Sequence, residues 1–507
     1  MSLLGIDVGT TGVKTVLINE DGSLRAEVTR AYPLHSPAPG WFEQDPEDWW
    51  AATVEAIRQV LRDGGTTGQD IKGVGLSGMY HGLVLLDQQG HVLRRSILWN
   101  DQRTARQSAF IVEKVGRERL RRICATGGAP YFTACKLQWV RDNEPSIFER
   151  VARIMLPKDY VRFRLTGEYC TDVTDASGTL FLDVAKRNWS DEIPELLGVP
   201  RSILPHLVES AAVSGQVSAA GRAATGLLPG TPVAGGGGDQ ACAAVGMGIV
   251  REGVASFSIG TSGVIYAATA APKTDNEGRF DTFCHAVPDT WCVLACINAA
   301  AGSHQWYQDK IAAWERAEAE RRGTTIFTVL DELAARAPVG SGKLLFLPYL
   351  AGERHPHTDT DARGVWFGLH AGHSREHLLR SVLEGVAFCF RDCLEAMKSH
   401  GIPMREVRAT GGGARSPLWL EIMANATGQE ILTMQADSGG ASFGAALLGG
   451  VAAGVFRNVE QACAATVATG TVVPCDATKE AEYRNLFEVF RSLYPALRES
   501  YRLLAAV

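Results

Sequence analysis

The stretch LLGIDVGTTGVKTVLI at residues 3–18 has a near copy, VASFSIGTSGVIYAAT, at residues 254–269. In each stretch an apolar run, a tight turn bounded by glycines and a second apolar run predict a β-hairpin. The turn glycines Gly9 and Gly260 lie 251 positions apart, about half of the 507-residue chain. A hairpin repeated at that spacing predicts a duplicated architecture.

A second pair of matching segments supports the duplication. These segments are VAGGGGDQACAAVGMG at 233–248 and VRATGGGARSPLWLEIMANATG at 407–428, and each passes from an apolar strand through glycines into a helical pattern. Such an elbow lets a ligand approach the backbone and places the N–H groups of a helix N-terminus beside it. Because one elbow falls in each half, we expect an α/β protein with two domains, 1–250 and 251–507.

The composition excludes several classes of protein. With 46% apolar and 21% charged residues, a net charge of -6 and no basic run, the chain has no electrostatic footprint for nucleic acid. It contains no uninterrupted apolar run of about 18 residues and starts without a basic leader, so we expect no membrane segment and a cytoplasmic location. Its 11 cysteines form no CxxC pair, which predicts reduced, mostly buried thiols.

The two halves differ in their carboxylates. Asp7 stands two positions before the first turn glycine, where the second hairpin has Ser258, and the first elbow ends in Asp239 where the second has Ala414-Arg415. A carboxylate in an apolar strand requires a metal ion or a hydrogen-bond network, so Asp7 needs a partner. Asp239 follows four glycines at the start of a helix, where it could take a proton from an attacking hydroxyl or cap the helix.

This arrangement suits phosphoryl transfer, in which a protein mainly positions groups and stabilises charge. The turn amides at 9–12 and 260–263, with the hydroxyls of Thr10, Thr11 and Thr261, can hold phosphate oxygens. Mg²⁺ commonly uses one or two carboxylates together with phosphates, and Asp7 could fill that role. We therefore expect ATP and Mg²⁺ in a cleft between the domains.

Three other motifs do not support the functions that they suggest. The segment 73–78, GVGLSG, fits a dinucleotide fingerprint, but an apolar strand follows it instead of a helix. The segment 340–343, GSGK, lacks the first glycine and the Ser/Thr of a P-loop. The residues 355–357, HPH, with Asp359 and Asp361, have the side chains of a metal site in a loop that looks exposed, without helical spacing to bring them together.

The chain resembles the FGGY carbohydrate kinases, which belong with actin, Hsp70 and hexokinase to a superfamily of duplicated ribonuclease-H-like domains. The resemblance covers nearly the whole sequence. Its segments are GIDVGTTGVK (5–14), WFEQDPEDWW (41–50), ILWNDQR (97–103), LPKDY (156–160), GGGGDQ (235–240), SIGTSGV (258–264), LPYLAGERHPH (347–357) and GGGARS (411–416).

The resemblance implies a role for each matching residue. Asp239 corresponds to the catalytic aspartate of the family and Asp7 to its metal-linked aspartate. The residues implied for the nucleotide are Thr10, Thr11, Gly260, Thr261, Gly302, Gly412, Gly413 and Ala414. Those implied for the sugar are Tyr80, His81, Trp99, Asn100, Asp239 and Gln240.

Within the family the chain is most similar to xylulokinases, which implies D-xylulose as the substrate. Their sugar loop reads Gln-Met-His-Gly, whereas this chain has Met79-Tyr80-His81-Gly82, a difference that changes the size and polarity of the pocket. Gluconate, ribulose, glycerol or another polyol are the alternatives. Two less favoured alternatives are an actin- or Hsp70-like ATPase and an inactive sugar sensor. The protein could also form a homodimer.

Overall fold

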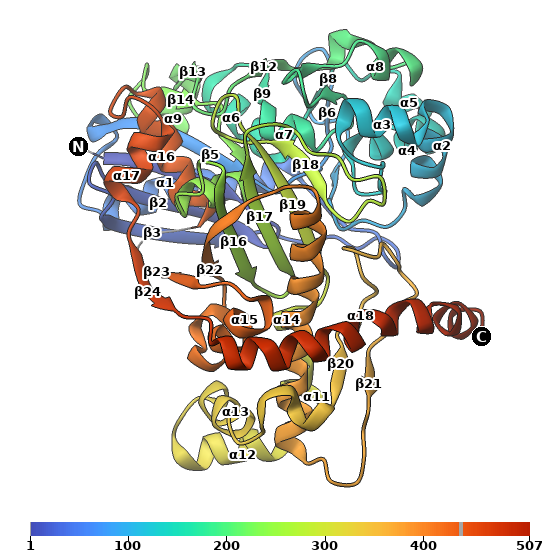
Figure 1. Cartoon of the computed structure of the whole chain (residues 1–507). Helices are drawn as coiled ribbons and strands as arrows, with labels where there is room; N and C mark the ends of the chain where they lie inside the picture. Colours follow the sequence, from blue (N-terminus) through green and yellow to red (C-terminus); the bar gives the residue numbers. More distant parts are fainter. Residues whose placement is uncertain (1, 436–439) are drawn as a thin grey trace.

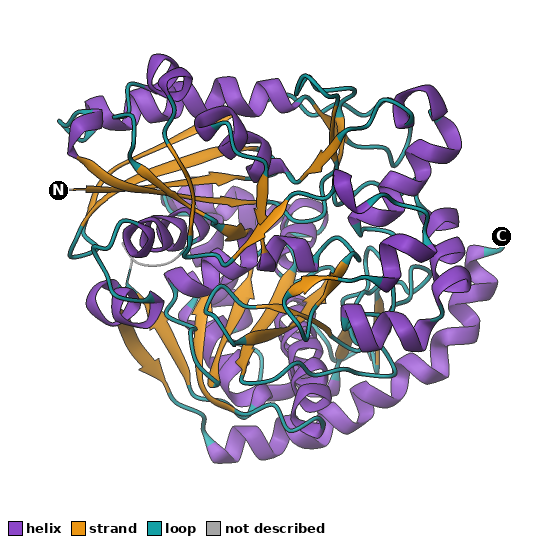
Figure 2. Ribbon diagram, turned by 90° about the horizontal axis from the view of Figure 1, so that it is seen from above, coloured by secondary structure: helices purple, strands orange, loops and turns teal. Residues whose placement is uncertain are grey.

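The computed structural model describes residues 2–435 and 440–507, and each half of the chain contains a seven-stranded central sheet (Figure 1). Helices surround both sheets, as the view from above shows (Figure 2). The protein is therefore α/β with two sheet-centred units, as the repeated hairpin predicts.

The first sheet has the strand order β13-β14-β5-β1-β2-β3, and β15 also pairs with β5. β1 runs antiparallel to β2 and parallel to β5, and β5 runs parallel to β14. The strands are β1 (Ser2–Val8), β2 (Gly12–Asn19), β3 (Leu24–Ala31), β5 (Ile71–Gly78), β13 (Val213–Gln216), β14 (Pro232–Ala234) and β15 (Gly237–Gly238).

The second sheet has the order β18-β19-β17-β16-β22-β23-β24. β16 runs antiparallel to β17 and parallel to β22, so its centre repeats that of the first sheet. The strands are β16 (Gly253–Ile259), β17 (Gly263–Thr269), β18 (Asp281–Cys284), β19 (Trp291–Ile297), β22 (Met404–Thr410), β23 (Ile431–Met434) and β24 (Thr469–Val473).

The duplication extends to the pairing of single residues. Asp7 lies opposite Ser77 in the parallel neighbour of β1, and Ser258 lies opposite Thr410 in the parallel neighbour of β16. Both parallel pairs shift register after their first residue. The turns differ by one residue, because the N–H of Gly9 donates to Gly12 O whereas that of Gly260 donates to Ser262 O, both at 3.1 Å.

The remaining strands form short two-stranded pairs. They are β4 (Glu43–Gln44) with β7 (Ser96–Ile97), β6 (Val84–Leu86) with β8 (Arg153–Met155), β9 (Cys170–Asp172) with β12 (His206–Val208), β10 (Leu182–Asp183) with β11 (Asn188–Trp189), and β20 (Leu345–Leu347) with β21 (Val365–Phe367).

The helices divide between the two halves of the chain. The first half contains α1 (Pro46–Asp63), α2 (Ala105–Val115), α3 (Arg117–Cys124), α4 (Thr133–Asn143), α5 (Pro145–Phe148), α6 (Pro157–Thr166), α7 (Val173–Ser177), α8 (Glu192–Leu196), α9 (Ala219–Thr225) and α10 (Asp239–Gly246). The second contains α11 (Ala301–Lys310), α12 (Ala313–Arg322), α13 (Ile326–Ala334), α14 (Arg375–Ser399), α15 (Pro417–Thr427), α16 (Ala441–Ala452), α17 (Val459–Thr466) and α18 (Ala477–Ala505).

Helix α1 covers one face of the first sheet. Asp45 caps it, accepting a hydrogen bond from the N–H of Glu47 at 3.0 Å, and Pro46 supplies the preset φ of the first turn. Trp49 is fully buried in the core that α1 forms with β1, β2 and β5. Asp45 and Pro46 therefore mark the start of α1, and Trp49 lies on the face that the helix buries.

Helix α16 comes from the second half of the chain and yet packs on the first sheet, against β1 and β5. The packing is backbone to backbone, because a Cβ at Gly5 would lie 1.9 Å from Ser442 O and one at Gly75 only 1.8 Å from Ala445 O. The glycines of GVGLSG therefore lie within β5 and make room for a helix. They form no dinucleotide loop, as we expected.

Other sequence predictions have mixed outcomes. All 11 cysteines are free, and most are buried, as predicted. The loop at 355–357 was predicted to be exposed, which is wrong: His355 is 3% exposed and accepts a hydrogen bond from the N–H of Cys296. His357 stacks on Tyr494 of α18, with ring centroids 3.7 Å apart. Within the described part of the chain, no helix is both long and apolar enough to cross a membrane.

Candidate active site

Asp7 lies near the end of β1, two residues before the first glycine of the turn. The Ser77 hydroxyl donates to Asp7 Oδ1 at 2.8 Å, because β5 runs parallel to β1 and places the two residues opposite each other. Burial raises the pKa of Asp7, while the Ser77 hydrogen bond and the charge of Lys14 partly oppose that rise. Among the described residues Oδ2 has no hydrogen-bond donor, so one oxygen is available to a cation or to its water.

Asp239 is the first residue of α10, and Gly238 occupies the N-cap position. The capping alternative is therefore wrong: Asp239 Oδ1 accepts the N–H of its neighbour Gln240 at 2.7 Å. Burial, followed by the charge of Asp7, raises the pKa of Asp239 to about 7. A carboxylate with that pKa is suited to accept a proton near neutral pH.

The Tyr80 side chain lies directly over the glycine-rich loop at residues 235–238. A Cβ at Gly238 would come within 2.1 Å of the Tyr80 ring, so only glycine fits beneath it. The ring also stacks on Phe283 of β18, with centroids 5.8 Å apart. Tyr80 therefore contacts both Gly238, which precedes Asp239, and Phe283 of β18 in the second sheet.

His81 adopts a positive φ of 68° and is almost fully buried. Its Nδ1 lies 2.9 Å from Gly178 O, so Nδ1 carries the proton and Nε2 is left as an acceptor. Burial and the charge of Lys136 lower the pKa of His81 to about 3, which keeps the ring neutral. The ring lies 5.0 Å from that of Tyr131. His81 therefore offers an uncharged hydrogen-bond acceptor, Nε2, beside aromatic side chains.

The segment at 97–101 runs beside this loop, because Leu83 and Ile97 form an antiparallel bridge. Trp99 Nε1 donates to Thr10 Oγ1 at 3.0 Å, which places the indole against the first glycine turn. Asn100 Oδ1 is buried and has no hydrogen-bond partner among the described residues. Asp101 instead pairs with Arg103 at 2.7 Å and has a structural role.

Of the residues predicted for the nucleotide, those in the second half of the chain lie around the end of β16, whereas Thr10 and Thr11 lie in the first glycine turn. The carbonyl of Thr261 accepts the N–H groups of Ala300 and Gly302, at 3.0 and 2.9 Å, so the second glycine turn packs on the start of α11. A Cβ at Gly413 would lie 2.4 Å from Ile259 Cγ2, which shows that the second elbow packs on the end of β16. Ala414 lines an adjoining pocket of about 540 Å³.

Several residues around the sugar loop were not predicted from the sequence. Thr126 and Tyr131 of the first half donate to Asp281 of β18, at 2.9 and 2.8 Å. Arg354 also donates to Asp281, at 3.1 Å, and lies 3.9 Å from the centre of the Tyr131 ring. These side chains come from three distant segments, so no local pattern could have revealed them.

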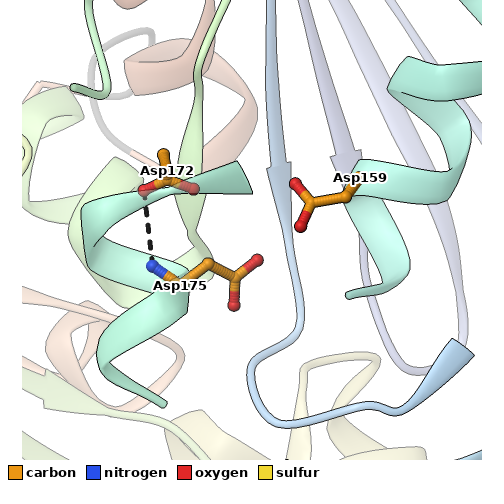
Figure 3. A group of neighbouring side chains, drawn as sticks. All are labelled: Asp159, Asp172 and Asp175. Carbon is orange, nitrogen blue, oxygen red and sulfur yellow. Dashed lines mark hydrogen bonds between the residues drawn. The ribbon is translucent and has the colours of Figure 1, made fainter. Parts of the chain in front are cut away.

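Three aspartates lie close enough together to suggest a metal site, namely Asp159, Asp172 and Asp175 (Figure 3). The Lys158 ammonium already lies among them, at 2.6 Å from Asp159, 2.6 Å from Asp172 and 3.0 Å from Asp175. Arg162 adds a second positive charge, 2.8 Å from Asp159. The group is therefore a buried ion cluster in which lysine takes the place of a metal.

Comparison with known proteins identifies the family. Residues 2–246 match the N-terminal domain of the FGGY family of carbohydrate kinases, and residues 255–453 match its C-terminal domain. The chain belongs to the FGGY family. It is 36% identical to a xylulose kinase of Bacillus subtilis over 97% of this chain and 96% of the relative. It is 38% identical to a xylulose kinase of Escherichia coli K12, over 97% and 99%.

Solved structures of FGGY kinases have the same fold. The crystal structure of a xylulose kinase from Rhodospirillum rubrum matches 99% of this chain and all of its own, with 31% identity and a TM-score of 0.91. A gluconate kinase from Lactobacillus acidophilus matches with the same TM-score at 26% identity, over 99% of each chain. The two-domain fold is thus shared by kinases with different sugar acceptors.

As an FGGY kinase, the protein transfers a phosphoryl group from ATP to a carbohydrate hydroxyl and uses Mg²⁺. The residues present fit such a cation. Asp7 and Asp239 are close enough to interact electrostatically, and one oxygen of Asp7 has no donor within the part of the chain that the structure describes. A divalent cation beside them would compensate two carboxylates that otherwise repel each other.

Proposed function

We propose that this protein phosphorylates D-xylulose with ATP and yields D-xylulose 5-phosphate and ADP. The observation that carries the proposal is the similarity to two bacterial xylulose kinases, at 36% and 38% identity over nearly the full length of each chain. The neutral acceptor at His81 and the aromatic side chains around it suit a small uncharged ketose.

We assign the role of general base to Asp239. The carboxylate accepts the proton of the attacking sugar hydroxyl as the hydroxyl oxygen forms a bond to the γ-phosphorus and the bond to the β-phosphate oxygen of ATP breaks. Its pKa of about 7 supports this role, because the group is both available as a base and able to release the proton afterwards. The neighbouring Gln240 holds the carboxylate through its N–H.

The phosphates bind between the two glycine turns in this proposal. The amides and hydroxyls around Thr10, Thr11, Gly260 and Thr261 donate to phosphate oxygens, and Gly302, Gly412, Gly413 and Ala414 line the nucleotide. Asp7 would hold Mg²⁺ directly or through water, and the cation would supply positive charge beside the phosphates. The protein contributes orientation and a site from which water is excluded.

The sugar binds beside Asp239, against Tyr80 and His81. His81 Nε2 accepts a hydrogen bond from a sugar hydroxyl, since Nδ1 is committed to Gly178 O. Asn100 Oδ1, which is buried without a partner among the described residues, supplies a second acceptor. Trp99 lies at the border between sugar and phosphate, where its N–H contacts Thr10.

A coupled assay of ADP release tests the substrate. Pentuloses, hexuloses, polyols and aldonic acids are compared at equal concentration, and we expect D-xylulose to give the highest kcat/KM. A higher kcat/KM with gluconate or glycerol would refute D-xylulose as the substrate. ADP release that does not respond to any sugar would contradict the proposal as a whole.

We further propose that the chain works as the two domains 1–250 and 251–507, in the cytoplasm, with a homodimer as the assembly to be tested. Light scattering of the purified protein across a range of concentrations measures the assembly. A mass of one chain at all concentrations would refute the dimer.

A further inference from the structure

The glycine-rich loop before Asp239 is attached at both ends to the buried ion cluster. Arg162 Nη1 donates to the carbonyl of Gly235 at 2.6 Å, and the N–H of Gly238 donates to Thr174 Oγ1 at 3.0 Å. Thr174 in turn donates its hydroxyl to Asp172. A continuous set of hydrogen bonds therefore joins the cluster to the residue that precedes the catalytic carboxylate.

The cluster is closed to solvent, and its two cations lie among three carboxyl groups. The side chains of Lys158, Asp159, Arg162, Asp172 and Asp175 have no exposed surface. Burial raises the pKa of Asp175 well above its usual range, while the charge of Lys158 opposes that rise. Figure 3 shows Asp172 and Asp175 on one segment and Asp159 on another. Breaking one of these ion pairs would leave a charge unpaired inside the protein, which is costly.

The loop needs external support because it has no side chains of its own. Residues 235–238 are all glycine, and Gly236 has a φ of +73°. Their positions are set by contacts of the backbone, since a Cβ at Gly236 would lie 2.1 Å from Leu76 O. Asp239 follows directly, so a shift of Gly238 moves the carboxylate with it.

We propose that Thr174 is a positioning residue, which Asp172 and Lys158 hold in place and which fixes Gly238 so that Asp239 points at the sugar hydroxyl. The inference rests on the proposed role of Asp239 as base. A displacement of about 1 Å at a catalytic group can lower turnover by about 100-fold. The proposed network needs no metal ion, because Lys158 supplies the positive charge beside Asp172.

The test compares Thr174→Val with Thr174→Ser and with a matched control, Thr225→Val. Thr225 is also buried, donates its hydroxyl to a carbonyl at 2.7 Å and accepts a backbone N–H at 3.3 Å, but it lies at the end of α9. We expect Thr174→Val to lower kcat by about 10- to 100-fold, with KM for D-xylulose changed less than about threefold. Thr174→Ser should restore kcat to within about threefold, and Thr225→Val should leave it within about twofold.

Asp239→Asn separates this inference from the proposed function. If Asp239→Asn is inactive and Thr174→Val has the kcat of the Thr225→Val control, the positioning role is refuted and the base remains. If Asp239→Asn keeps near-normal kcat, both are refuted. When Thr174 acts only through Asp239, adding Thr174→Val to Asp239→Asn should cause little further loss, and a full additional loss would overturn the proposal. Thr174→Ala serves the same comparison if the valine variant does not fold.

Discussion

The contact between Tyr80 and the glycine-rich loop at residues 235–238 makes Gly238→Ala a sharp perturbation. The new Cβ would lie 2.1 Å from the nearest atom of the Tyr80 ring, whereas ordinary van der Waals contact begins at 3.4 Å, so ring and loop must separate by at least 1.3 Å. The ring has little room to move, because it stacks on Phe283. Overpacking of this kind costs about 1–3 kcal/mol of stability, and a displacement of that size near the base lowers kcat about 100-fold.

Steady-state kinetics and thermal unfolding measure the two effects. The matched variant is Gly238→Ala with Tyr80→Met, in which a flexible side chain replaces the ring and can move away from the new methyl group. We expect the double variant to recover most of the lost kcat and stability. Wild-type kcat and melting temperature in Gly238→Ala alone would refute the packing of Tyr80 on the loop. If the double variant has the same kcat and melting temperature as Gly238→Ala alone, the clash with the Tyr80 ring is not the cause of the loss.

Two further predictions concern the base and the close packing of α16. Burial and the charge of Asp7 raise the pKa of Asp239 to about 7, and only the ionised carboxylate accepts a proton. We therefore expect kcat/KM for D-xylulose to fall about tenfold for each pH unit below 7. A kcat/KM that does not change between pH 5 and 7 would contradict this prediction. Gly75→Ala should lower the melting temperature through a clash 1.8 Å from Ala445 O, at a cost of about 1–3 kcal/mol or more. Gly127→Ala, where a Cβ meets nothing within 4 Å, is its control, and equal melting temperatures would argue against the close contact.

The sequence predicts well what depends on local pattern. Both hairpins form where the alternation of apolar runs and glycine turns places them, and α1 begins at the Asp45-Pro46 signal. The difference between Asp7 and Ser258 also had direct physical meaning, because a carboxylate in a buried strand needs partners. These features depend on residues that are close together in the sequence, so a short segment is enough to predict them.

The sequence predicts poorly what depends on distant packing. The crossing of α16 onto the first sheet needs Gly5 and Gly75 to lie opposite its backbone, a match between segments several hundred residues apart. The burial of His355 depends on Cys296 and Asp281, which no local pattern connects with it. The capping alternative for Asp239 failed for a subtler reason, since a helix boundary displaced by one residue gives the cap to Gly238.

The most direct test of the account is sugar-dependent ADP release by Asp239→Asn beside the wild-type protein. The account predicts that the wild type releases ADP in response to D-xylulose. In the variant, kcat should be lower by about 10²- to 10⁴-fold, the range for a lost general base, with D-xylulose binding and melting temperature retained. Near-normal kcat in the variant would contradict the role of Asp239, and ADP release that is indifferent to D-xylulose would contradict the proposed substrate.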